Sequence, residues 1–249
     1  MLSGLIKSMR PRQWSKNAFV FVALLFDRKL FDPVSVAAVL GAFILLCLMS
    51  SAVYLMNDLA DIESDRQHPT KKDRPLPSGR LNPRVAMVAS FLLAAVSLVA
   101  GYFLSYKLAI LLLLYLISQI AYTFKLKHVV LLDVLTIASG FILRIAAGVA
   151  VIDVERFSPW LYVFGGFLAL FMALGKRRAE LTLLGGGAGS HRAILDDYSL
   201  DLIDRLQSIV TTSAIVAYSL YTFLAEGLPE NHAMMLTIPF VLYAIFRYL

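Results

Sequence analysis

An acidic motif followed at once by basic residues lies at residues 57–79, between two long apolar segments. If its first part is helical, Asp58, Asp61 and Asp65 occupy positions i, i+3 and i+7 of one helix face. Carboxylates stacked in this way repel one another unless a cation lies between them. Mg²⁺ suits such a group, because it binds one or two carboxylates, several waters and substrate phosphates. We therefore predict a Mg²⁺ site, with Mn²⁺ as an alternative metal, whose ligands and catalytic residues are Asn57, Asp58, Asp61 and Asp65.

The basic residues that follow this motif have the chemistry of phosphate ligands. Arg and Lys side chains bind phosphate oxygens through charge-assisted hydrogen bonds. The alternative interpretation is a solvated, charged loop between two membrane helices. The regular spacing of the acids favours a metal–diphosphate site at a membrane surface. The substrate-binding candidates in this segment are Arg66, Lys71 and Arg74.

The chain as a whole has the composition of a membrane protein. Hydrophobic residues make up 59% of it and the mean hydropathy is +0.74. Several apolar runs approach the roughly 20 residues that cross a bilayer as a helix. We predict an all-α, polytopic transmembrane bundle in which residues 1–249 form one domain. About eight spans fit the sequence, at residues 17–30, 34–56, 85–104, 108–124, 129–152, 160–174, 202–224 and 234–249.

Three polar segments lie outside these spans. Residues 1–16 have the pattern of an amphipathic segment at the membrane surface. Residues 57–84 form the loop that contains the acidic motif, and residues 175–201 form a second, basic loop. The Asn82-Pro83 pair predicts the helix start after the first loop, with Asn as the cap and Pro at the first helical position.

The distribution of positive charge predicts the orientation. If the N-terminus is cytoplasmic and eight spans alternate, 18 of the 23 Lys and Arg residues fall in cytoplasmic segments. This asymmetry follows the positive-inside rule and predicts that the acidic motif, the short basic loop at residues 125–128 and the basic loop at residues 175–201 are cytoplasmic. We expect these loops to lie together over one cavity at a plasma membrane. The residues outside this pattern are Arg28, Lys29, Lys107, Arg144 and Arg156.

Further charged residues lie after the fourth span, within the fifth span and after the sixth span. Lys125 and Lys127, close to Tyr122, are either substrate ligands or positive-inside anchors. Asp133 lies about one turn into the fifth span, where an ionisable residue is costly and therefore a functional candidate. Arg144 lies deeper, and pairing, snorkelling and substrate contact all remain open for it. The Lys176, Arg177 and Arg178 run is either a stop-transfer signal or a set of phosphate ligands.

Several other chemistries do not fit the sequence. The four histidines have no zinc-like spacing, and no Ser-His-Asp set is recognisable. The glycine run at residues 185–189 lacks the Lys-Ser/Thr of a P-loop. We attribute the net charge of +6 to membrane topology and an anionic substrate, and expect no nucleic-acid partner.

Taken together, the motifs Asn57-Asp58-x-x-Asp61-x-x-x-Asp65 and Arg74-Pro75-Leu76-x-Ser78-Gly79 resemble those of the UbiA superfamily of intramembrane prenyltransferases. The resemblance covers nearly the whole chain. It implies about nine helices around a central cavity with a cytoplasmic polar cap. Since only eight spans fit here and the chain stops inside an apolar run, we expect a ninth to be missing.

One branch of this superfamily matches in further motifs. Most members transfer a prenyl group from a Mg²⁺-bound prenyl diphosphate, and they carry a second acidic motif after the sixth span. Here that loop begins with basic residues instead. The chain is similar to the polyprenyl-phosphate (decaprenyl-phosphate) phosphoribosyltransferases in Arg10-Pro11-x-Gln13-Trp14-x-Lys16-Asn17, Lys125-Leu126-Lys127-His128-Val129-x-x-x-Asp133, Gly175-Lys176-Arg177-Arg178-x-Glu180 and His191-Arg192-x-x-Leu195-x-x-Tyr198.

This second resemblance implies 5-phosphoribosyl 1-diphosphate as the donor and a polyprenyl phosphate as the acceptor, in the synthesis of cell-wall arabinan precursors. The alternative is a prenyltransferase that acts on an aromatic or other lipid acceptor, and a transporter or non-catalytic membrane protein is the third reading. The sequence leaves open whether the chain forms a homo-oligomer. The resemblance adds His191 and Tyr198 to the substrate-binding candidates, and Arg10 and Lys16 are candidates for the lipid phosphate.

Overall fold

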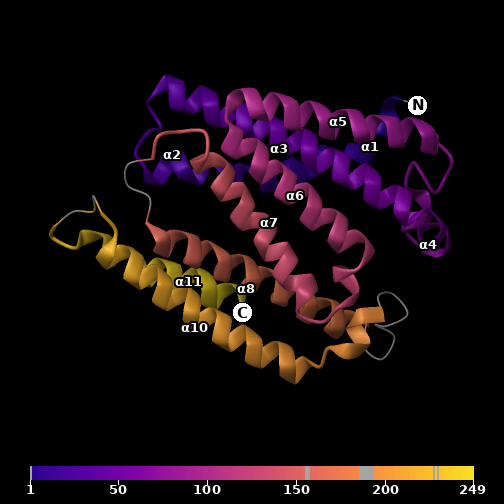
Figure 1. The fold of residues 1–249 in the computed structure, drawn as a ribbon. Coiled ribbons are helices and arrows are strands. Elements are labelled where there is room, and N and C mark those ends of the chain that lie inside the picture. The colour runs from indigo at the N-terminus through magenta and orange to yellow at the C-terminus, as the bar shows by residue number, and fades with distance from the viewer. Residues whose placement is uncertain (1, 155–157, 185–192, 227, 229) are drawn as a thin grey trace. The chain divides into compact units, whose positions relative to one another are not determined.

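A computed structural model of the protein describes residues 2–154, 158–184, 193–226, 228 and 230–249. Helices and turns make up this part of the chain, and it contains no strand, which confirms the all-α prediction (Figure 1). The elements are α1 (Leu2–Met9), η1 (Pro11–Phe21), α2 (Val22–Phe26), α3 (Pro33–Ala60), α4 (Ile62–Gln67), η2 (Lys71–Asp73), α5 (Pro83–Leu104), α6 (Tyr106–Phe124), η3 (Leu126–His128), α7 (Leu132–Val149), α8 (Pro159–Leu184), η5 (Ala193–Asp197), α10 (Leu200–Leu224), η6 (Ala233–Thr237) and α11 (Ile238–Tyr248).

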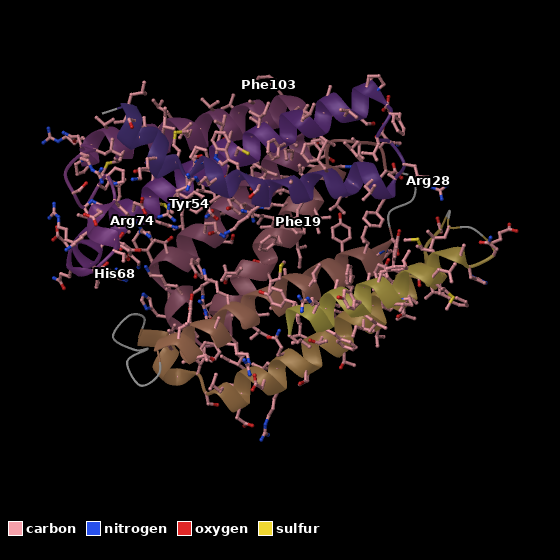
Figure 2. All side chains as sticks on the ribbon, turned by 180° about the vertical axis from the view of Figure 1, so that it is seen from behind. Phe19, Arg28, Tyr54, His68, Arg74 and Phe103 are labelled. Carbon is pink, nitrogen blue, oxygen red and sulfur yellow. The ribbon has the colours of Figure 1, made fainter. Side chains whose placement is uncertain are left out.

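Five helices within the described residues are long and apolar enough to cross a membrane. They are α3, α5, α6, α7 and α8, and each overlaps one of the predicted spans. The exposed side chains of α5 fit this assignment, because Phe91 and Phe103 are 74% and 83% exposed. Phe103 lies at the outer edge in Figure 2, where a bilayer would surround it. The chain is therefore a multi-pass membrane protein.

The structure differs from the predicted boundaries at three spans. The predicted first span, residues 17–30, is occupied by the end of η1 and the short helix α2. The predicted last span contains only the 11-residue helix α11, preceded by η6. α8 continues to Leu184, ten residues past the predicted end of the sixth span, because the residues after Gly175 are mostly good helix formers and contain no proline. The count of eight spans stays a prediction.

The chain divides into two compact units, and each is described by itself. Unit 1 comprises Met1–Thr123 and Leu143–Asp153. Its central helix is α3, which packs against α1, η1 and α5, and α3 and α5 run side by side in Figure 1. Buried side chains of α3 and α6, including Met49 and Leu112, form its main core with Val20 of η1.

Helix caps in unit 1 follow the sequence signals. Asp32 caps α3 by accepting from the amides of Val34 and Ser35, and Asn82 caps α5 by accepting from the amide of Arg84 at 2.8 Å. The predicted helix start at Asn82-Pro83 is therefore confirmed.

Unit 2 comprises Phe124–Ile142 and Val154–Leu249. α10 packs along α8 and also contacts α11 and η6. The core of unit 2 contains Val134 of α7, Phe171 and Leu174 of α8, and Ile203 of α10. α10 begins at a cap in which the Ser199 hydroxyl accepts from the amide of Leu202.

Candidate functional site

The end of α3 carries the first residues of the acidic motif. α3 continues through Asn57 and Asp58 to Ala60, and the single residue Asp61 separates it from α4. The amide of Asp65 donates to the carbonyl of Asp61 at 2.8 Å, so helical hydrogen bonding resumes directly after the turn. Asp58 and Asp65 are both buried, with 3% and 2% exposure. Two carboxylates of the predicted set are thus withdrawn from solvent on consecutive helical segments.

Arg74 bridges these two carboxylates. Its Nη1 lies 2.7 Å from Asp65 Oδ2 and 3.4 Å from Asp58 Oδ1. Lys71 Nζ lies 3.7 Å from Asp65 Oδ1, and Arg10 Nη2 lies 2.5 Å from Asp58 Oδ1. The guanidinium of Arg74 is thus a cation that the two carboxylates share. The five residues Arg10, Asp58, Asp65, Lys71 and Arg74 are called the acid–base cluster below.

The loop after η2 holds Arg74 beside α3. The Ser78 hydroxyl donates to the Arg74 carbonyl at 2.6 Å. Leu76 and Leu81 are buried against Leu55 of α3. Arg74, Tyr54 and His68 lie at one end of unit 1, whereas Arg28 lies at the other end (Figure 2). The apolar contacts of this loop therefore position the Arg74 guanidinium at the end of α3 that carries the acids.

The remaining candidates of unit 1 lie around this cluster or are directed away from it. Asn57 Oδ1 accepts a hydrogen bond from the Thr123 hydroxyl, and Asp61 is half-buried. Arg66 pairs with the exposed Glu63 at 2.7 Å, so its guanidinium is directed to a surface carboxylate. Lys16 is an exposed residue of η1, and Tyr122 is a half-buried residue of α6.

A second buried polar group in unit 1 surrounds Arg144. Its Nε donates to Asn17 Oδ1 at 2.8 Å, and its Nη2 donates to the Tyr115 hydroxyl at 3.0 Å. The Asn17 amide in turn donates to the Ser50 hydroxyl at 3.2 Å. Of the readings left open for Arg144, pairing within the protein is the one that these contacts support. Sequence analysis missed Asn17 and Tyr115 as its partners, because neither residue carries a charge that would mark it.

Unit 2 gathers three candidates that are far apart in the sequence. Arg177 Nε lies 2.8 Å from Asp133 Oδ2, and the Tyr198 hydroxyl donates to Asp133 Oδ1 at 2.7 Å. Arg177 Nη1 also pairs with Glu180 at 2.6 Å, and the Arg177 side chain is 1% exposed. The Tyr198 oxygen accepts from the amide of Leu131 at 2.9 Å. Burial, together with the hydrogen bond to Asp133, raises the pKa of Tyr198 to about 12.

The other basic candidates of unit 2 are more accessible. Lys176 is 70% exposed and lies 3.9 Å from Glu180, and Arg178 pairs with Asp204 of α10 at 2.7 Å. Arg178 also lines an open cavity of about 810 Å³ between α8, α10 and the end of α11. Lys125 is exposed and Lys127 is half-buried at η3. His191 lies outside the described residues.

The donor set at the acidic motif fits a divalent cation that completes its shell with other ligands. Among the residues that the structure describes, no three His, Cys, Asp or Glu side chains are grouped closely enough to hold a metal ion. Asp58 and Asp65 nevertheless provide two buried carboxylates that share a contact with one Arg74 nitrogen atom. Mg²⁺ typically takes one or two protein carboxylates and obtains the rest from waters and phosphates. The residues therefore fit Mg²⁺ bound together with a phosphorylated substrate.

The sequence matches the UbiA prenyltransferase family over residues 18–179. The chain belongs to this family. Solved structures of the UbiA fold are similar to it throughout. A UbiA homolog from Archaeoglobus fulgidus bound to GPP and Mg²⁺ has a TM-score of 0.81 and 16% identity, with 98% of this chain and 85% of that chain covered. A digeranylgeranylglyceryl phosphate synthase has a TM-score of 0.75 and 18% identity, with 99% and 86% covered.

Two curated UbiA relatives share more of the sequence. The decaprenyl-phosphate phosphoribosyltransferase of Mycolicibacterium smegmatis is 39% identical over 227 residues, which cover 90% of this chain and 71% of that protein. The enzyme of the same name from Mycobacterium tuberculosis is 33% identical over 252 residues, which cover all of this chain and 83% of that protein. These similarities confirm the predicted branch of the UbiA family, and the chain is a transferase.

Proposed function

We propose that the protein transfers a 5-phosphoribosyl group from 5-phosphoribosyl 1-diphosphate to a polyprenyl phosphate and releases diphosphate. The similarity to relatives named decaprenyl-phosphate phosphoribosyltransferase supports the substrate pair. The observation that carries the proposal is the acid–base cluster, in which three cationic side chains surround two buried carboxylates. Such a cluster provides ligands for a metal ion and for phosphate oxygens at one position.

Asp58 and Asp65 are the proposed metal ligands, with Asn57 and Asp61 as further candidates beside them. A bound Mg²⁺ would stabilise the negative charge that develops on the leaving diphosphate. Arg10, Lys71 and Arg74 are the proposed ligands of the phosphate oxygens, because each already holds a carboxylate of the cluster. Their charge stabilises the leaving group without reorganisation of solvent.

The proposed reaction exchanges one C–O bond for another. The bond between ribose C1 and the diphosphate oxygen breaks, and the electron pair leaves with the diphosphate. An oxygen of the lipid phosphate forms the new bond to C1. This nucleophile is already an anion, so the protein needs no general base to activate it. The protein must instead supply positive charge that neutralises several phosphates. The many Lys and Arg residues in the loops at residues 57–84 and 175–201 agree with this requirement.

The basic residues of unit 2 are the proposed ligands of the remaining phosphates. Lys125, Lys127 and Lys176 are the best placed for this role, since they are exposed or half-buried. Arg177 is held by two carboxylates and is almost fully buried, which favours a positioning role. We further propose that the acidic motif faces the cytoplasm, as the distribution of Lys and Arg predicts.

A prenyl transfer is the second candidate function. Its support is the similarity of fold to a UbiA homolog bound to GPP and Mg²⁺. The experiment incubates the purified protein and Mg²⁺ with decaprenyl phosphate and labelled 5-phosphoribosyl 1-diphosphate, and measures label in the lipid phase. A parallel reaction supplies labelled geranyl diphosphate with an aromatic acceptor. We expect label only in the first reaction, and none from Asp58→Asn; transfer only in the second would overturn the proposal.

A further inference from the structure

Arg10 occupies the carboxylate that the proposed metal would need. Its Nη2 lies 2.5 Å from Asp58 Oδ1, and Asp58 is 3% exposed. Its guanidinium also lies over the ring of Tyr54, 4.8 Å from the ring centroid. Tyr54 and Asp58 are four residues apart on α3, so they share one helix face. Arg10 is therefore attached to this face by an ion pair and by a cation–π contact.

The backbone around Arg10 is fixed on both sides. The Ser51 hydroxyl, which donates to the Cys47 carbonyl at 2.7 Å, also lies 3.2 Å from the Met9 carbonyl oxygen, and Trp14 Nε1 donates to the Ser51 oxygen at 3.0 Å. Arg10 itself has a left-handed backbone conformation with φ 54°, which is uncommon for a residue other than glycine. Any change of partner must therefore come from rotation of the Arg10 side chain and not from movement of the segment.

Arg10 and Arg74 differ in what they would lose if a metal bound Asp58. Arg74 keeps its 2.7 Å contact with Asp65 Oδ2. Arg10 has Asp58 as its only carboxylate contact within 4.0 Å among the described residues. It is 31% exposed, so its guanidinium is accessible to a ligand that arrives from solvent. A cation on Asp58 would repel Arg10 unless an anion arrived at the same time.

We infer that Arg10 is the resident counter-ion of Asp58 and exchanges this carboxylate for a phosphate of the substrate when a divalent cation binds. The inference rests on the proposed metal–diphosphate site and predicts that tight binding of the metal to this site requires the diphosphate. Metal alone binds weakly, because it must displace Arg10 without compensation. Metal with a diphosphate binds more tightly, because Arg10 gains a new anionic partner as it leaves Asp58. Arg10 thereby couples metal affinity to the presence of phosphate.

Binding of Mn²⁺, followed by its paramagnetic resonance signal in the purified protein, tests this coupling with and without inorganic diphosphate. The variants are Arg10→Gln, Arg10→Lys and Arg12→Gln. Arg12 is an exposed residue of the same segment, so its variant controls for the loss of one positive charge. Arg10→Lys keeps the charge and tests whether charge is what competes with the metal. A melting temperature for each variant identifies loss of the fold.

In the absence of diphosphate, Arg10→Gln should bind Mn²⁺ about tenfold more tightly than the unmodified protein, a change of about 1.4 kcal/mol, since the metal no longer has to displace a charge-assisted contact. Diphosphate should tighten Mn²⁺ binding less in this variant than in the unmodified protein. Arg12→Gln and Arg10→Lys should retain the original weak binding. Equal Mn²⁺ affinity for Arg10→Gln and Arg12→Gln would overturn the inference, as would the absence of Mn²⁺ binding in every sample. Mn²⁺ binding as expected, without transfer of phosphoribosyl to lipid, would instead refute the proposed function alone.

Discussion

The hydroxyl of Tyr198 donates a 2.7 Å hydrogen bond to Asp133, a residue that lies 65 positions earlier in the chain. The same hydroxyl oxygen accepts from the amide of Leu131, so one tyrosine satisfies two groups at the start of α7. Asp133 also binds Arg177, which is almost fully buried. Tyr198 therefore neutralises no charge itself, but it fixes the carboxylate on which Arg177 depends.

Replacement of Tyr198 by Phe should destabilise unit 2 by about 1–2 kcal/mol, since it removes the hydrogen bond to the buried Asp133 carboxylate and the acceptor of the Leu131 amide. The effect should depend on pH, because folding raises the pKa of Tyr198 from 10.0 to about 12. A raised pKa in the folded state means that the contribution is complete below about pH 10 and is lost as the pH rises toward 12. Thermal unfolding of both proteins across this range is the measurement. A difference in melting temperature that stays constant up to pH 12 would contradict the assignment.

Asp65→Asn should abolish most of the transfer activity. Asp65 is 2% exposed and holds Arg74 at 2.7 Å, so the change removes a proposed metal ligand and the main partner of a proposed phosphate ligand. We expect kcat to fall by about 100-fold or more, as is typical when charge stabilisation of a leaving group is lost. The matched control is Glu63→Gln, two residues away, where the carboxylate is 80% exposed and pairs only with Arg66 in the described residues. Comparable kcat values for the two variants would remove Asp65 from the reaction.

Part of this cluster could be predicted from the sequence, because its acids are close together in the chain. Asp58 and Asp65 are seven residues apart, lie on the consecutive helices α3 and α4, and both contact Arg74. The contact between Arg10 and Asp58 was not predictable in this way. It joins residues 48 positions apart and depends on how α1 and η1 pack against α3. An amphipathic segment can be recognised from its sequence, but the residue it presents to a partner cannot.

The end of α8 differs from the predicted end of the sixth span, although the sequence after that point favours a longer helix. The Lys176 to Arg178 run was interpreted as the start of a loop because charge usually marks the end of a membrane span. Charge does not interrupt a helix, however, and the first strong breakers are the glycines at residues 185–189. As a result, successive residues of this run have different surroundings. Arg177 is buried against Asp133, whereas Lys176 and Arg178 are exposed.

This helical periodicity predicts different consequences for two adjacent arginines. Arg177→Met should lower the free energy of unfolding by about 3–5 kcal/mol, because it removes one partner of the buried Arg177–Asp133 ion pair. Arg178→Met should change it little, because its pair with Asp204 is half exposed and screened by solvent. Denaturant or thermal unfolding in detergent micelles measures both changes.

A donor titration decides whether Arg177 also binds substrate. If Arg177 acts by positioning, a variant that retains the fold should lose activity in kcat and leave the KM for the donor close to its original value. An unchanged melting temperature with a large rise in donor KM would show instead that Arg177 contacts the phosphates directly.

Gly148→Ala should be among the most destabilising small substitutions in unit 1. A Cβ atom at Gly148 of α7 would overlap the carbonyl oxygen of Val20 in η1, and a backbone atom cannot rotate away. The residues on either side of this contact, Asn17 and Arg144, form the buried hydrogen bond at 2.8 Å. Forced separation of η1 from α7 should therefore cost the packing penalty of about 1–3 kcal/mol or more and weaken that hydrogen bond as well.

Gly41→Ala is the matched control for this substitution. Gly41 also lies within a membrane helix, α3, but a Cβ atom there would meet only the terminal Leu104 Cδ2 at 3.1 Å. That methyl group can shift, and alanine is favoured over glycine in a helix by about 0.5–1 kcal/mol, so the net change should be small. Melting temperatures of the two variants give the comparison. If Gly148→Ala melts at the same temperature as Gly41→Ala, α7 and η1 are not packed as closely as the Gly148–Val20 contact requires.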